Sequence, residues 1–81
     1  MAVTRKLAFQ YDYRLPAGTD VEVLSVEPMD FVEGGFAAEV RFPAHSEALY
    51  LSINWLTPED GDDFKAGKIA GVPNKDGNER K

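Results

Sequence analysis

The chain has 81 residues, a net charge of −5 and no cysteine, with 43% hydrophobic and 28% charged residues. This composition is typical of one small globular domain, and it excludes both a disulfide framework and a thiolate metal site. Because small secreted domains usually need disulfides, and because no signal-peptide core or apolar run of ~18 residues is present, we expect a soluble, cytoplasmic protein with no membrane contact.

The first element is predicted from alternation. Apolar residues fall on odd positions from Val3 to Leu15, including Leu7, Phe9, Tyr11 and Tyr13, with Arg5 as the exception. A period of two is typical of a half-buried strand, so these side chains are expected to face the core. The turn residues Pro16, Ala17 and Gly18 end the strand.

Three further strands are predicted along the chain. The second contains Val21 and Val23, but Leu24 and Val26 change phase, which indicates either a bulge near Leu24 or a strand covered on both faces. The third places Phe36, Ala38, Val40 and Phe42 on one face. The fourth places Leu49, Leu51, Ile53 and Trp55 inward, with Tyr50, Ser52, Asn54 and Leu56 on the other side. Pro58 then ends the ladder.

The C-terminal part is predicted to be mostly irregular. Residues 58–73 could hold one helical turn but no longer helix, because Gly61 and Gly67 disfavour a helix that continues through them. Ile69 and Val72 would form either a short fifth strand or an apolar segment packed back on the sheet. We expect one domain over residues 1–72 and a polar tail over 73–81, which contains no apolar residue beyond Pro73 and should be mobile on its own.

The segments LPAGTDVEVLSVEP, GGFAAEVRFP and EALYLSINWLTP resemble the strand pattern of SH3-like small barrels over residues 15–58. This resemblance implies an all-β fold, namely a small SH3-like antiparallel barrel of 4–5 strands with a mostly irregular C-terminal tail. The pattern is shared by many unrelated small barrels, so it implies no activity.

No catalytic, cofactor or metal motif is present. His45, Ser46 and Glu47 are adjacent in a turn, where three side chains rarely converge on one point, so we interpret His45 as solvated. The acids in EDGDD, residues 59–63, lack the spacing of a calcium loop and are predicted to form a solvated acidic turn. We expect no enzymatic activity, cofactor or metal site.

Charge is strongly segregated along the chain. Residues 15–64 contain eleven acids and one base, Arg41, whereas both ends are basic. Such a field keeps a small protein soluble, and it also suits attraction to a larger protein with a basic surface.

The apolar loop EPMDFVEGGF, residues 27–36, supplies a possible anchor, because connections rarely carry three large apolar side chains. We expect Val32 to cover the core, and Met29 and Phe31 to contact the partner. The predicted partner-binding residues are Asp20, Glu22, Glu27, Met29, Asp30, Phe31, Glu33, Glu39 and Tyr50.

These features predict a protein–protein interaction module, acting as a monomer or small homo-oligomer. A specific version is a phage or mobile-element inhibitor of the anti-CRISPR type, which occupies a nucleic-acid-binding site by mimicking nucleic acid. One alternative is a nucleic-acid-associated barrel using a basic tail of Lys65, Lys68, Lys75, Arg80 and Lys81, which the acidic middle section disfavours. The other is a small subunit of an oligomeric enzyme.

Overall fold

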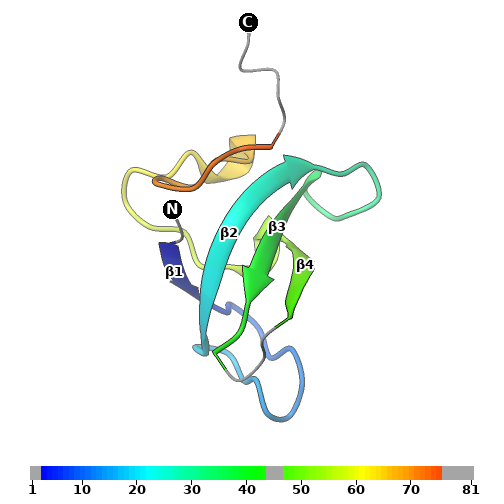
Figure 1. Ribbon diagram of the computed structural model, residues 1–81, viewed down its shortest axis with the longest axis vertical. Helices are drawn as coiled ribbons and strands as arrows, with labels where there is room; N and C mark the ends of the chain where they lie inside the picture. The colour runs from blue at the N-terminus through cyan, green and yellow to red at the C-terminus, as the bar shows by residue number, and fades with distance from the viewer. Residues whose placement is uncertain (1–2, 44–46, 76–81) are drawn as a thin grey trace, which may run out of the picture.

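The computed structural model describes residues 3–43 and 47–75, and it contains four antiparallel strands in the order β1-β2-β3-β4 (Figure 1). The strands are β1 (Val3–Lys6), β2 (Asp20–Pro28), β3 (Phe36–Arg41) and β4 (Ala48–Ser52). Two short 3-10 turns follow, η1 (Ile53–Trp55) and η2 (Phe64–Ala66). The prediction of a small all-β fold is confirmed. The described chain has no helix long and apolar enough to cross a membrane.

The sheet is open, because no ladder joins β1 to β4. The chain leaving η1 instead reaches the outer edge of β1 through one bridge, Leu7 to Leu56. The Ala8 N–H donates to Trp55 O at 2.7 Å, and the Thr57 N–H donates to Lys6 O at 3.0 Å. These bonds place η1 beside the start of the chain.

β2 contains the predicted bulge. Val23 pairs with Val40 and Ser25 pairs with Glu39, which leaves Leu24 as the extra residue between them. The bulge moves the inward phase from Val21 and Val23 to Val26, so all three valines are at most 1% exposed. The bulge at Leu24 is therefore the cause of the phase change in the sequence of β2.

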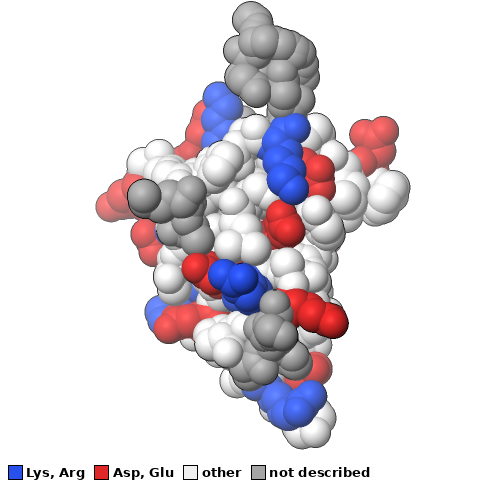
Figure 2. Space-filling view, viewed as in Figure 1, with Lys and Arg blue, Asp and Glu red and all other residues white. Residues whose placement is uncertain are grey.

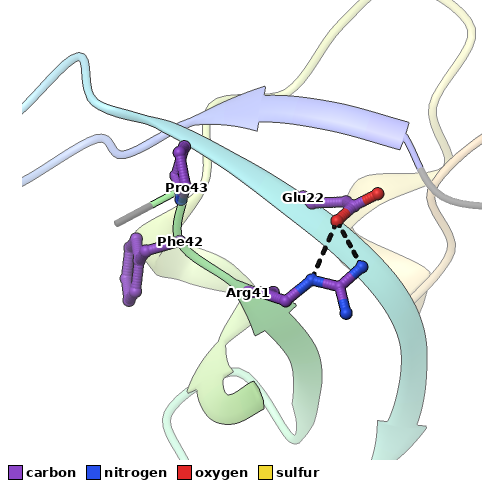
Figure 3. Close-up of a pocket in the computed structure, with 4 residues that line it drawn as sticks. All are labelled: Glu22, Arg41, Phe42 and Pro43. Atoms are coloured by element: carbon purple, nitrogen blue, oxygen red, sulfur yellow. Dashed lines mark hydrogen bonds and ion pairs between the residues drawn. The ribbon is translucent and has the colours of Figure 1, made fainter. Parts of the chain in front are cut away.

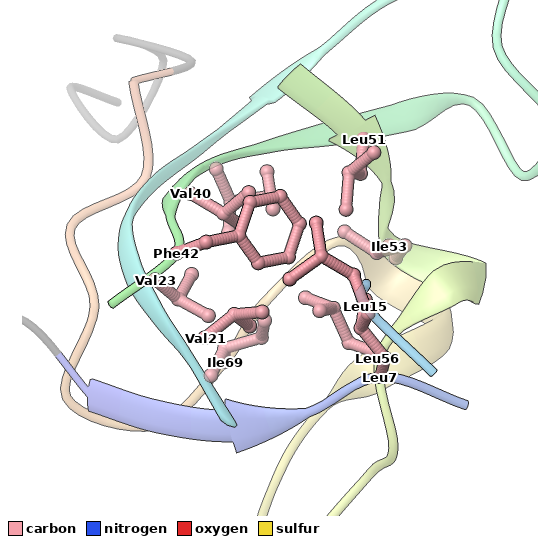
Figure 4. Packing of buried hydrophobic residues seen from close by; sticks show 12 residues of the cluster. Leu7, Leu15, Val21, Val23, Val40, Phe42, Leu51, Ile53, Leu56 and Ile69 are labelled. Carbon is pink, nitrogen blue, oxygen red and sulfur yellow. The ribbon is translucent and has the colours of Figure 1, made fainter. Parts of the chain in front are cut away.

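The core lies on the concave side of the sheet, where side chains from every strand except β1 meet side chains from the connections (Figure 4). Its cluster consists of Leu7, Leu15, Val21, Val23, Val26, Ala38, Val40, Phe42, Leu51, Ile53, Leu56 and Ile69. Burial of this apolar surface supplies the main stabilisation, at ~25 cal/mol per Å².

The first predicted strand is too long, and the inward placement of its aromatic residues is wrong. β1 ends at Lys6, and Phe9, Tyr11 and Tyr13 are 57%, 41% and 83% exposed. A tight turn reverses the chain, because Asp12 Oδ1 accepts the Arg14 N–H at 2.7 Å and Leu15 N–H donates to Asp12 O at 2.9 Å. An aspartate that bonds the backbone two residues later stabilises such a turn.

The last predicted strand is also too long. The Ser52 hydroxyl accepts the Asn54 N–H at 3.1 Å, which starts η1 where the sequence predicted continued strand. The 3-10 turn rotates the chain, so Leu56 is 1% exposed inside the core while Tyr50 and Asn54 remain exposed. The expectation that Leu56 shares an outer face with Tyr50 and Asn54 is therefore wrong.

The C-terminal segment packs back on the sheet and forms no fifth ladder strand among the described residues. Ile69 is 3% exposed within the core, and η2 provides the single helical turn expected in this region. Residues 73–75 then join β2, because Val26 N–H donates to Pro73 O at 3.1 Å and Lys75 N–H donates to Val26 O at 2.6 Å. The start of the predicted mobile tail is thus held by backbone bonds, whereas residues 76–81 lie outside the described residues.

Candidate partner-binding surfaces

The loop between β2 and β3 is a compact turn with one large apolar side chain at its tip. Met29 N–H donates to Gly35 O at 2.9 Å and Gly35 N–H donates to Val32 O at 3.1 Å. The Ser52 hydroxyl donates to the Glu33 carbonyl oxygen at 2.5 Å, which attaches the loop to the end of β4. The backbone of the loop is therefore supported on both sides.

Within this loop the apolar side chains differ in exposure. Phe31 is 87% exposed, the highest value among the large hydrophobic residues described. Met29 and Val32 are half-buried, in keeping with a partial covering role for Val32. An aromatic side chain held in solvent on a supported loop is available to fill a pocket on a partner.

Acidic side chains surround this tip. Asp30 and Glu33 are exposed and Glu27 is half-buried, and none of the three forms an ion pair with another described residue. Figure 2 shows acidic groups projecting from the molecule at the upper right, where Figure 1 places this loop. We name Phe31 with Glu27, Asp30 and Glu33 the loop tip.

The other predicted acidic contacts are paired with cations of the same chain. Asp20 bonds Lys6 at 2.6 Å, Glu22 bonds Arg41 at 2.7 Å and Glu39 bonds Lys75 at 3.1 Å. Figure 2 accordingly shows blue and red side chains interleaved over the body of the molecule. The acidic surface predicted from the sequence is thus partly neutralised away from the loop tip.

Glu39 shows the electrostatic effect of this pairing. The hydrogen bonds from Lys75 and Ser25 lower the pKa of Glu39 below its usual value of 4.5. In return, the Glu39 carboxylate raises the pKa of Lys75 above 10.5. Both groups stay charged at neutral pH, and each reduces the field of the other.

One shallow depression of about 300 Å³ lies beside the Glu22–Arg41 pair (Figure 3). Phe42 and Pro43 complete its lining, and the Arg41 guanidinium donates to Glu22 Oε1 at 3.1 and 2.7 Å. Because the two charges satisfy each other, this depression offers little to recognise a charged ligand.

Tyr50 lies on the outer face of the sheet as predicted, opposite Glu39 of β3, and is 46% exposed. It is the central residue of β4, two residues before the Ser52 that bonds the loop, and its cross-strand neighbour Glu39 is not a loop-tip residue. The structure therefore brings the loop-tip residues together but does not place Tyr50 among them.

A second exposed surface was missed by sequence reasoning. Phe9 and Trp55 meet edge to face with ring centroids 5.9 Å apart, and Tyr11 lies 5.9 Å from Trp55 and 5.5 Å from Phe42. Tyr13 follows at the tip of the same turn, with the Arg14 guanidinium 5.6 Å from its ring. We name Phe9, Tyr11 and Trp55, whose rings are in contact, together with the neighbouring Tyr13, the aromatic cluster.

The acidic turn at residues 59–63 is solvated only in part. Asp62 is 1% exposed at its side chain and accepts two hydrogen bonds from Arg5, at 2.9 and 2.7 Å. The prediction of a fully solvated turn is wrong for Asp62, because Arg5 points inward and needs a buried counter-charge. Glu59, Asp60 and Asp63 remain exposed.

The described residues were also compared with the requirements of a metal site. No group of three or more histidine, cysteine, aspartate or glutamate side chains in residues 3–43 and 47–75 is placed to hold a metal ion. The interpretation of His45 as a solvated turn residue stays a prediction, because His45 and Ser46 lie outside the described residues.

No protein-family model, curated protein or solved structure matches the chain.

Proposed function

We propose that this chain is a non-enzymatic protein-interaction module that presents its loop tip to a basic surface on a larger protein. The observation that carries the proposal is Phe31, 87% exposed on a loop held by backbone bonds and by Ser52. Aromatic anchors of this kind supply much of the energy of a typical interface, and unpaired acids around them select and steer a basic partner.

A specific version is an inhibitor from a phage or mobile element, of the anti-CRISPR type, that blocks a nucleic-acid-binding site. The acids of the loop tip would take the place of phosphates there, and a domain of this size needs no activity of its own to obstruct a site. The acids paired on the sheet contribute less, so the mimicry is concentrated at Asp30 and Glu33.

The finer fold proposal is an SH3-like barrel. It is supported by η1, after which Leu56 forms a bridge to Leu7, so the chain that follows β4 reaches the opposite side of the sheet at the end of β1. Small barrels of many families present their connecting loops to partners, but this fold by itself selects no function.

The aromatic cluster favours a second candidate surface for the same class of function. Exposed rings in mutual contact can pack on an extended, proline-rich segment of a partner, as aromatic-lined sites do in several recognition domains. The two surfaces lie on different connections of the chain, so they can be tested separately.

The test compares Phe31→Asp with Tyr13→Asp in capture of partners from the native or competing host, followed by their identification. Both substitutions place a carboxylate at an aromatic position more than 80% exposed, at 87% and 83%. We expect Phe31→Asp to leave the melting temperature nearly unchanged and to abolish capture, while Tyr13→Asp leaves both unchanged.

Loss of capture in Tyr13→Asp alone would transfer the function to the aromatic cluster. If neither substitution affects capture, or if Phe31→Asp lowers the melting temperature strongly, the loop tip does not dock and the proposal fails.

A further inference from the structure

The chain covers the edges of its sheet unevenly. Residues 55–57 bond the chain at the C-terminal end of β1, through Lys6 and Ala8, and residues 73–75 bond the part of β2 beyond β1. β4 is the last strand in the sheet order, and within residues 3–43 and 47–75 no backbone bond beyond its ladder with β3 reaches it. In Figure 1 it forms the right-hand margin of the sheet.

The sequence of β4 lacks the features that normally protect an edge strand. Ala48, Leu49, Tyr50, Leu51 and Ser52 include no charge, proline or glycine. Their register with β3 is continuous, from Arg41 opposite Ala48 to Ala37 opposite Ser52, with no bulge. Lysine, proline and bulges are the usual devices against strand addition, so an edge without them is able to pair with another chain.

The charges at the two ends of β4 indicate which chain would pair with it. Glu47 directly precedes the strand and is exposed, and the exposed Glu33 is held at the other end by the bond from Ser52. An uncharged edge with an acid at each end is complementary to an extended segment with basic ends.

A second copy fits less well. Antiparallel pairing of two β4 strands about Tyr50 sets Ala48 opposite Ser52 of the other copy. This arrangement brings Glu47 of one copy toward Glu33 of the other at both ends. Like charges placed together in this way disfavour self-association.

We propose that β4 accepts an extended basic segment of a partner protein by strand addition. Main-chain hydrogen bonds along β4 would give affinity, and Glu47 and Glu33 would select lysine or arginine at the ends of the added strand. The inference rests on the proposed function for the basic character of the partner, but it concerns an edge that the loop-tip test does not probe.

The experiment titrates the ¹⁵N-labelled full chain with a synthetic peptide of alternating threonine and valine flanked by lysines. We expect shift changes in Ala48–Ser52 and, at about ten times Kd, about tenfold slower exchange of the β4 amides that face outward. A peptide N-methylated at every residue of the threonine–valine segment, which has no N–H to donate to β4 from either edge, should not bind. A peptide with glutamate in place of lysine should bind more weakly, and Glu47→Lys should reduce this preference.

Several results would overturn the proposal: no binding, equal binding of the N-methylated peptide, or shifts confined to the loop tip or the aromatic cluster. Protection of β4 that rises with protein concentration without peptide would assign the edge to a second copy. The titration is repeated on Phe31→Asp, where we expect an unchanged result, so that failure of the edge and failure of the loop tip are told apart.

Discussion

Arg5 occupies an inward-facing position of β1 and is 4% exposed. A charge in such a position is tolerated when it is paired, and Asp62 supplies the pair from 57 residues further along the chain. Asp62 also accepts the Ala70 N–H at 3.0 Å and the Glu59 N–H at 3.2 Å. One carboxylate thus holds the C-terminal segment against the first strand.

Asp62→Asn should destabilise the fold by up to about 3–5 kcal/mol, because the buried Arg5 loses its hydrogen-bonded carboxylate and keeps only the exposed Glu59 carboxylate at 3.5 Å. Burial acts to raise the pKa of Asp62, but hydrogen bonds from Ala70, Arg5 and Glu59 outweigh it and lower the pKa below 3.8. The contribution is therefore complete above about pH 4 and is lost as pH falls through the lowered pKa. Urea unfolding at neutral and acid pH measures it.

Glu22→Gln serves as the matched control, since it removes one carboxylate charge from an exposed pair with Arg41. It should cost at most about 1 kcal/mol. Equal destabilisation by the two substitutions, or a difference that does not diminish as the pH falls below 3.8, would contradict the role assigned to Asp62.

At the scale of elements, periodicity was sufficient where a strand pairs along its whole length. Alternation alone predicted the inward residues of β3, and it gave a bulge near Leu24 as one of two explanations for the phase change in β2. Alternation could not show that the chain turns back at Asp12 after β1 has ended at Lys6, nor that Ser52 starts a 3-10 turn. Both features depend on local bonds between a side chain and the backbone, which alternation does not reveal. For this reason Tyr11 and Tyr13 were predicted to be buried and Leu56 to be on the outer face, and all three predictions were wrong.

The end of η2 provides a test of how this element packs. Gly67 has φ of +80°, and a Cβ built there would collide with the ring of Phe36. Gly67→Ala should therefore cost more than the about 1–2 kcal/mol of a left-handed backbone alone, and 1 kcal/mol lowers the melting temperature of a domain this size by about 4–8 °C.

Gly18→Ala isolates the backbone part of this cost. Gly18 has φ of +91°, and nothing lies within 4 Å of a Cβ built there. Thermal unfolding of both variants should give the larger loss for Gly67→Ala. Equal losses would mean that Phe36 does not pack on η2.

At the scale of the whole molecule, the sequence identified the loop tip but overestimated the acidic surface. Composition gives the charge of a segment, whereas Lys6, Arg41 and Lys75 reach their acids through strand pairing and the return of residues 73–75 to β2. The aromatic cluster was missed for a similar reason, because it joins residues 9–13 to Trp55 across the bridge between Leu7 and Leu56.

The distribution of charge also favours a protein partner over nucleic acid. The net charge is −5, and of the cations expected to bind phosphate, Lys75 is bonded to Glu39 while Arg80 and Lys81 lie outside the described residues. Lys65 and Lys68 are exposed, and they closely follow the acids of residues 59–63 along the chain.

We therefore expect the protein to pass through a heparin column and to leave labelled DNA unbound at ~150 mM salt, because phosphate neutralisation supplies most nonspecific affinity. Glu39→Gln releases Lys75 and lowers the negative charge by one, yet it should not create retention. Retention of the unaltered chain on heparin would instead favour the basic tail and remove the basis for nucleic-acid mimicry.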